Sequence, residues 1–287
     1  MLSARERGPN THKYRFPRAR NNSRPLKVSE PPGSLLYSLP LPLFGLAMLA
    51  MVAAAHWAGQ LVRGRTQSAD AEKQDGFAPA PPVVSSILGL LTLLISFTFS
   101  MAIGGYDKRY DAVIDEAHAI YATDLDARLA APQTDGFRAM LKHYVALRLA
   151  AATSTSARRT QELTRESSVT QQRLWETANA LRQASPTRTT NLLQTTESMI
   201  AVGMRRVALR QPVVPIRVLF GVILFTIVSS FVLGYSYRGV THRTSGALLL
   251  LLTLVIVLIV DVEQPSSGAI RESQQPMQDA RARLLAN

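Results

Sequence analysis

Four consecutive residues, Asp115, Glu116, Ala117 and His118, could carry metal chemistry. Carboxylate oxygens and imidazole nitrogens are common ligands of divalent metals in proteins. The same four letters occur in nucleotide-driven helicases, where the acids organise Mg²⁺ and water. On a helix, Asp115 and His118 share one side because residues three apart are neighbours, and Glu116 points elsewhere. His143, on the following helix, is the further candidate ligand.

The rest of the chain does not support that chemistry. A helicase needs a loop of the form G-x-x-x-x-G-K-[ST] to bind phosphates, and this sequence contains no Gly-Lys pair. A solvated or ion-paired helix face, in which Asp111 or Asp115 meets Lys108 or Arg109, is the simpler interpretation. The five His residues are scattered, and no serine-centred motif occurs. We therefore expect no enzyme activity, no metal site and no cofactor.

Composition indicates a membrane protein. The 287 residues include 32 Lys and Arg against 20 Asp and Glu, a net charge of +12, and no Cys. That charge alone would permit a nucleic-acid partner, but the apolar residues are concentrated in stretches that can cross a bilayer, which takes roughly 20 residues. We predict a lipid-bilayer partner, no nucleic-acid partner and four transmembrane helices, at residues 35–59, 83–105, 213–235 and 245–261.

The basic residues predict the orientation of the spans. Residues 1–34 hold eight Lys and Arg and two acids, whereas residues 60–82 hold three of each sign. The positive-inside rule then places this basic, disordered leader in the cytoplasm. Four spans put residues 106–212 and the tail at 262–287 on the same side. Both termini are therefore expected to be cytoplasmic.

Residues 106–212 read as helices. Apolar residues recur at helical spacing after Gly105, and only Pro132 interrupts them, so the second span should continue as one long helix. Further helices are expected at about 134–152, 157–183 and 187–212, separated by turn residues and Pro186. The predicted fold class is all-α, with four transmembrane helices and a cytoplasmic helical bundle between spans 2 and 3.

One face of the second span carries small and hydroxyl-bearing residues. At about 100° per residue, Thr92, Ser96 and Ser100 share this face and Ile103 joins it. Such a face can pack against another helix or line a pore in which a bulky residue forms an apolar constriction. The candidate pore-lining residues are Thr92, Ser96, Phe97, Phe99, Ser100 and Ile103.

Three stretches, "SFTFSMAIGGYDKRYDAVIDEAHAI", "HYVALRL" and "LIVDVEQPSSGAIRESQQPMQDARARL", resemble the bacterial bestrophin-like domain family, whose function is unknown. The resemblance covers roughly residues 83–284. His118 stands where that family usually has Asn, Glu263 replaces an Asp, and Glu272 replaces an apolar residue. The matching residues are Phe97, Phe99, Ser100, Arg109, Glu116, Ala117, Asp261, Pro265, Gly268, Ile270, Arg271, Ser273 and Pro276.

The resemblance implies a function. Bestrophins are pentameric ion channels whose second span lines the pore and carries Phe at its neck. By analogy, the chain would be a homo-oligomeric channel for chloride or another small ion in a bacterial inner (cytoplasmic) membrane. Helical geometry favours Phe99 as the constriction, whereas the register of the family favours Phe97. The alternative is a non-conducting membrane protein whose cytoplasmic bundle binds a partner.

The tail carries a second motif, formed by Asp261, Glu263, Pro265, Gly268 and Arg271. Asp261 falls where the fourth span ends, and Pro265 and Gly268 predict a turn. Arg271 could then pair with Asp261, with Glu263 or with an acid of the bundle. Animal bestrophins carry a strongly acidic Ca²⁺ clasp after the last span, but only Asp261 and Glu263 remain of it here, so the resemblance does not extend to calcium gating. We expect the tail to fold back against the helical bundle.

Overall fold

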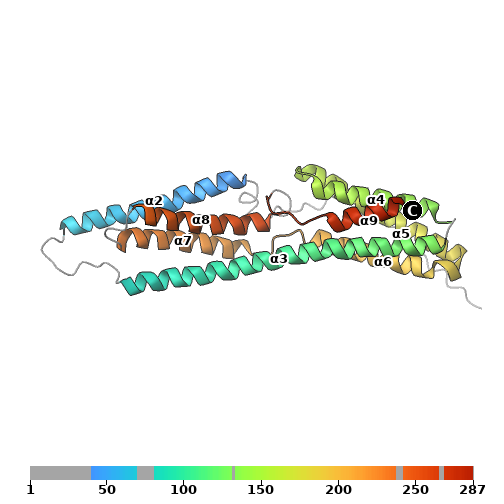
Figure 1. Ribbon diagram of the computed structural model, residues 1–287, viewed down its shortest axis with the longest axis horizontal. Coiled ribbons are helices and arrows are strands. Elements are labelled where there is room, and N and C mark those ends of the chain that lie inside the picture. Colours follow the sequence, from blue (N-terminus) through green and yellow to red (C-terminus); the bar gives the residue numbers. More distant parts are fainter. Residues whose placement is uncertain (1–39, 70–80, 131–132, 237–241, 265–267, 287) are drawn as a thin grey trace, which may run out of the picture. The chain divides into compact units, whose positions relative to one another are not determined.

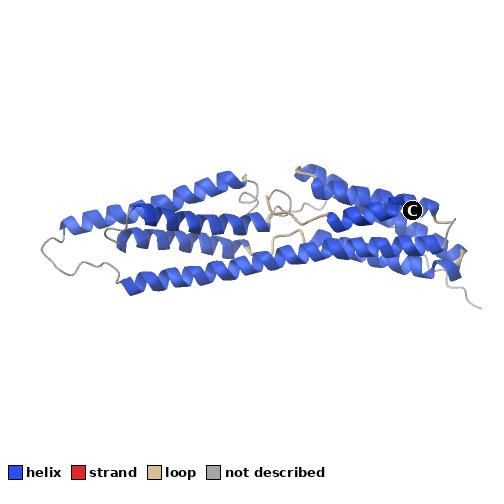
Figure 2. Cartoon of the chain, viewed as in Figure 1, coloured by secondary structure: helices blue, strands red, loops and turns tan. Residues whose placement is uncertain are grey.

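The computed structural model describes residues 40–69, 81–130, 133–236, 242–264 and 268–286. Every regular element in these ranges is an α-helix, and none is a strand, as Figure 2 shows. The predicted all-α class is therefore confirmed. The basic leader and Pro265 lie outside the described residues.

Four of the described helices are long and apolar enough to cross a membrane, which confirms the predicted number of spans. They are α2 (Leu41–Ala69), the first part of α3 (Pro81–Leu129), α7 (Ile216–Ser236) and α8 (His242–Glu263). Helices α2 and α3 each pack against both α7 and α8. These contacts bury one apolar core, which includes Met48, Val52, Leu219, Val222 and Ile256.

Helix α3 belongs to both halves of the fold. It is one continuous α-helix of 49 residues, or about 74 Å at about 1.5 Å per residue. A hydrocarbon core is about 30 Å thick, so the second half of α3 must extend beyond the membrane. The predicted continuation through Gly104 and Gly105 is confirmed. Gly105 allows close packing, because a Cβ there would lie 2.8 Å from Cγ2 of Val213.

The second half of α3 forms a bundle with α4 (Asp135–Thr153), α5 (Ala157–Ala184), α6 (Pro186–Ala208) and α9 (Gln275–Ala286) (Figure 1). Helix α3 packs against α6 and α9, and α5 packs against α4 and α6. Their apolar faces bury a second core, which includes Phe137, Leu141, Leu174, Leu192 and Met199. This core gives the polar segment between the spans a rigid framework.

Proline and serine set the ends of the bundle helices. Ser156 caps α5 by accepting a hydrogen bond from the backbone N–H of Arg159 at 3.4 Å, and Pro186 is the first residue of α6. Helix α6 ends at Ala208, four residues before the expected end at Pro212. The ring of a proline clashes with the carbonyl four residues earlier in a helix. Pro212 therefore cannot continue α6 beyond that point.

Helices α2 and α7 approach each other so closely that their backbones touch. A Cβ on Gly59 would collide with the carbonyl oxygen of Phe231, and a Cβ on Gly234 would collide with that of His56. Two glycines, one on each helix, therefore permit this crossing, as is common where small residues let membrane helices pack closely.

Gly234→Ala should destabilise the protein because the new methyl group must push two backbones apart. Overpacking of this kind costs about 1–3 kcal/mol. Gly221→Ala, on the same helix, is the matched control because a Cβ there meets nothing within 4 Å. The measurement is the thermal unfolding midpoint in detergent. Equal midpoints for the two variants would contradict the close crossing.

Candidate functional site

Glu116 lies at the centre of the bundle with 0% of its surface exposed. Its carboxylate accepts two hydrogen bonds from Arg148, at 2.7 and 2.9 Å, and one from Nη1 of Arg206, at 2.6 Å. The hydroxyl of Tyr144 donates a further hydrogen bond to Oε1. Two guanidinium groups thus share one buried carboxylate, and the three charges come from α3, α4 and α6. We call Glu116, Tyr144, Arg148 and Arg206 the bundle ion cluster.

Two further residues complete the surroundings of the bundle ion cluster. The side-chain amide of Gln171, on α5, donates to the hydroxyl of Tyr144 at 2.9 Å. Gly203, on α6, leaves room for these groups, because a Cβ there would lie 2.5 Å from Nε2 of Gln171 and 2.7 Å from the Tyr144 hydroxyl. The cluster therefore joins four helices through polar contacts.

The bundle ion cluster holds its protons firmly. Burial raises the pKa of Tyr144, and the carboxylate of Glu116 raises it further. Burial acts to lower the pKa of Arg148, but the attraction of Glu116 outweighs it and the pKa is raised. A general acid or base works best with a pKa near the operating pH. Tyr144 and Arg148 are therefore unsuited to act as a general acid or base. We interpret the cluster as a fixed arrangement of charges that organises the bundle.

The tetrad at 115–118 is divided between two environments. Asp115 is half exposed and lies 3.7 Å from Nη1 of Arg205, His118 is exposed, and only Glu116 enters the core. The prediction that Glu116 points away from Asp115 and His118 is confirmed. Within the described ranges, no three His, Asp or Glu side chains come close enough to hold a metal ion.

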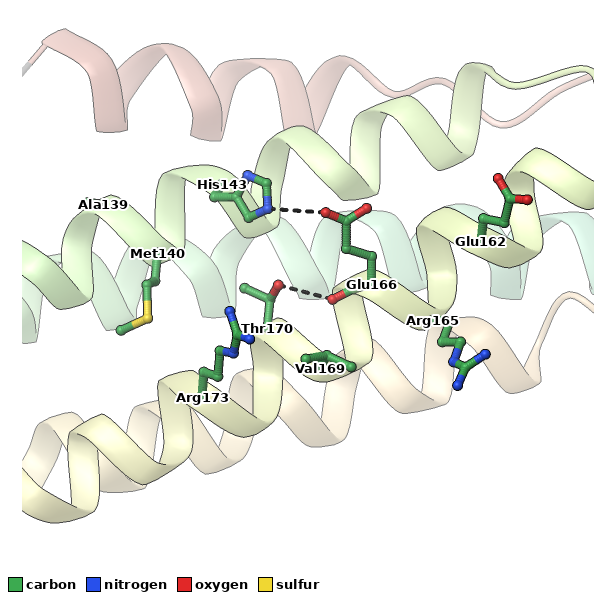
Figure 3. A pocket seen from close by; sticks show the side chains of 9 residues that line it. All are labelled: Ala139, Met140, His143, Glu162, Arg165, Glu166, Val169, Thr170 and Arg173. Carbon is green, nitrogen blue, oxygen red and sulfur yellow. Dashed lines mark hydrogen bonds and ion pairs between the residues drawn. The ribbon is translucent and has the colours of Figure 1, made fainter. Parts of the chain in front are cut away.

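His143 also lies away from that tetrad. It lines an open pocket of about 660 Å³ between α4 and α5, and its Nε2 lies 3.6 Å from Oε1 of Glu166 (Figure 3). Arg165 and Arg173 line the same pocket, and Thr170 donates to the backbone carbonyl of Glu166 at 3.0 Å. His143 and Glu166 are more than half exposed. This pocket is a solvated surface of mixed charge.

Arg109 connects the bundle to the tail. Its side chain is 4% exposed, and its guanidinium group pairs with Glu272 at 2.5 Å and donates to the carbonyl oxygen of Val262 at 2.7 Å. The interpretation that Arg109 meets Asp111 or Asp115 on its own helix is therefore wrong. Arg206 makes the second connection, because its Nη2 donates to the side-chain oxygen of Gln274 at 2.7 Å.

Asp261 and Gly268 form the turn at the end of α8. Oδ1 of Asp261 accepts a hydrogen bond from the backbone N–H of Ala269 at 2.6 Å. A Cβ on Gly268 would lie 2.5 Å from the carbonyl oxygen of Asp261, so no larger residue fits there. Oε2 of Glu263 accepts from the backbone N–H of Val214 at 3.2 Å, which ties α8 to the segment before α7.

The expectation that Arg271 pairs with Asp261, Glu263 or an acid of the bundle is wrong. Backbone N–H groups already engage both tail carboxylates. Arg271 donates instead to the carbonyl oxygen of Gly268 at 3.1 Å, and makes no ion pair with any residue that the structure describes.

The tail does fold back, as expected. Helix α9 packs against α3 and α4, and Met277 and Leu284 join the bundle core. The guanidinium of Arg283 lies 5.2 Å from the centre of the Tyr121 ring, within the range of a cation–π contact.

The candidate pore-lining residues on α3 differ in exposure. Four of them are exposed: Thr92, Ser96, Phe97 and Ser100. Phe97 is 66% exposed and is more open than Phe99. Phe99 and Ile103 are partly buried against the membrane core. Phe99 also lines an apolar groove of about 410 Å³ between α3 and α8, together with Thr92 and Ser96.

The comparison with protein-family models matches residues 46–277 to the bestrophin-like domain. The chain belongs to the bestrophin-like domain family. No curated protein and no solved structure matches it. With four apolar helices, this bestrophin-like chain is a multi-pass membrane protein.

The residues that carried the family resemblance make the buried polar contacts of this bestrophin-like fold. Arg109 holds the tail, and Glu116 is the carboxylate of the bundle ion cluster. Asp261 and Gly268 together form the turn after α8. Sequence reasoning missed Arg148 as the partner of Glu116. One signal existed: Arg148 follows Leu141 and Tyr144 at helical spacing, so a charged residue occupies an apolar stripe.

Glu116→Gln should destabilise the bundle strongly, because Arg148 and Arg206 would keep their charges in a buried site without the carboxylate. Removing one partner of a buried ion pair costs about 3–5 kcal/mol. Glu166→Gln removes an exposed carboxylate beside His143 and should cost about 0–1 kcal/mol. Unfolding of the detergent-purified protein, followed by circular dichroism, measures both. A Glu116→Gln variant as stable as Glu166→Gln would show that the cluster contributes little.

Proposed function

We propose that the chain is a subunit of a homo-oligomeric ion channel, selective for small anions such as chloride, with the membrane half of α3 lining the conducting path. The observation that carries the proposal is an uncovered face of α3 on which Gly89, Leu93, Ser96, Phe97 and Ser100 are all exposed. The other described helices of the chain leave this face free. One such face cannot enclose a path, so several subunits must meet around it.

The hydroxyl groups on and beside this face support a path that contains water. Thr92 donates to the carbonyl of Leu88 at 2.9 Å and Ser96 to that of Thr92 at 2.8 Å, so each hydroxyl is bonded within its own helix. Each oxygen still has acceptor capacity, which water can use and lipid tails cannot. A hydroxyl-bearing face therefore fits an aqueous path better than a lipid contact.

Phe97 would form the constriction. It is open on the uncovered face, whereas Phe99 packs toward α8. A ring of Phe97 side chains would narrow the path and close it by dewetting, because an apolar collar holds water poorly and ions then cross at high cost. Membership of the bestrophin-like family adds to this argument by analogy only.

We also propose a bacterial inner-membrane location with both termini in the cytoplasm, because eight Lys and Arg precede the first span. The absence of Cys allows a direct test with single cysteines. In intact cells, a membrane-impermeant maleimide should label Arg65→Cys, at the end of the candidate span in α2, but not Thr155→Cys, in the turn before α5. Both should react after permeabilisation. Labelling of only Thr155→Cys in intact cells would reverse the topology.

Phe97→Ala should raise basal conductance in planar bilayers, because a smaller side chain widens and wets the collar. Phe220→Ala is the matched control, since Phe220 is an exposed membrane phenylalanine on α7 (52%) outside the proposed path, and it should conduct as the wild type does. Light scattering should detect an oligomer.

One outcome of these measurements would contradict the channel proposal. If the wild type and both variants are silent and the protein is a monomer or dimer, the channel proposal fails. The alternative, a non-conducting membrane protein whose helical bundle binds a partner, would then account for the α4–α5 pocket.

A further inference from the structure

A small cavity lies where α3, the end of α6 and the tail meet. Four arginines line it: Arg109 from α3, Arg206 and Arg210 from the end of α6 and the residues after it, and Arg271 from the tail. Glu272 is the one carboxylate in the lining, so the four positive charges and one negative charge leave a net +3 (4 − 1). The accessible space is about 30 Å³.

The carboxylates of the protein neutralise these arginines only in part. Arg109 is paired with Glu272, but its Nη1 is buried and has no hydrogen-bond partner. Arg206 shares the carboxylate of Glu116 with Arg148. Nearly all buried polar groups in proteins are hydrogen-bonded, so the buried Nη1 of Arg109 requires an explanation.

Arg210 also lacks a partner within the described part of the protein. Its side chain is half-buried and makes no hydrogen bond or ion pair with any residue in the described ranges. Burial lowers the pKa of Arg210 to about 10; the nearby charges of Arg148 and Arg206 contribute to this shift, and those of Glu272 and Glu116 oppose it without cancelling it. A cation that is partly removed from water and placed beside like charges is unfavourable unless an anion offsets it.

We propose that this cavity binds one small inorganic anion of about the size of chloride, held by Arg210, Arg109 and Arg271. A site needs about 10–15 Å³ of this kind of space for one water-sized sphere, so about 30 Å³ admits a monatomic anion, whereas a phosphate or a lipid headgroup would have to extend out of the cavity. Guanidinium groups provide several N–H donors in a plane, which suits a spherical acceptor. The proposal is independent of any conduction through α3.

The anion would join the tail to the bundle. Arg109 belongs to α3, Arg210 follows α6, and Arg271 belongs to the segment that leads to α9. A ligand that contacts all three stabilises the docked tail, and its concentration sets the extent of that stabilisation.

Thermal unfolding of the full-length protein in detergent tests the proposal. Sodium chloride replaces sodium gluconate at constant ionic strength, so that only the anion changes. The wild-type midpoint should rise with the logarithm of the chloride concentration above the dissociation constant. Arg210→Gln should abolish that rise, and Arg271→Gln should reduce it from the tail side of the cavity.

Arg205→Gln is the control, because Arg205 directly precedes Arg206 in the chain but is exposed and paired with Asp115. The chloride response of this variant should match that of the wild type. Equal midpoints of the wild type in chloride and gluconate would overturn the proposal, as would a full chloride response in Arg210→Gln. A larger rise of the unfolding midpoint with phosphate than with chloride would contradict the proposal that the bound anion is of about the size of chloride.

Discussion

The carboxylate of Glu116, buried between the guanidinium groups of Arg148 and Arg206, is the interaction on which the rest of the bundle depends. A buried carboxylate is tolerated only when opposite charges and hydrogen bonds compensate for the lost water. Each partner stands on a different helix, so α3, α4 and α6 can pack only in the arrangement that brings the three together. The polar cluster thereby selects one packing of helices whose apolar faces alone would allow others.

Arg206, the second arginine of the bundle ion cluster, also contacts the tail. Arg206 contacts Glu116 with one nitrogen and Gln274 with the other, and Arg109 joins Glu272 and the end of α8. Because α3 begins in the membrane layer and ends in the bundle, a shift at this junction would be transmitted along one rigid helix. The cavity of four arginines lies at this same junction.

Much of the fold follows from the sequence because its signals are local. Apolar stretches of sufficient length predict the four spans, and turn residues together with Pro186 predict where the bundle helices are separated. The continuation of α3 through Gly104 and Gly105 was also predictable, since no proline interrupts it. Helix α6 ends at Ala208, before the predicted end at Pro212, because the ring of a proline also clashes with the carbonyl four residues earlier.

The sequence by itself determined the composition of the membrane layer, the helical class and the family resemblance, because these depend on hydropathy, periodicity and motifs along the chain. Only the tertiary structure decided which charges meet. Glu116 pairs with residues 32 and 90 positions away, and Arg109 with one 163 positions away. Periodicity specifies the face of a helix but not the partner across it. For that reason the predicted partners of Arg271, which were Asp261, Glu263 or an acid of the bundle, are wrong: backbone N–H groups engage both tail carboxylates.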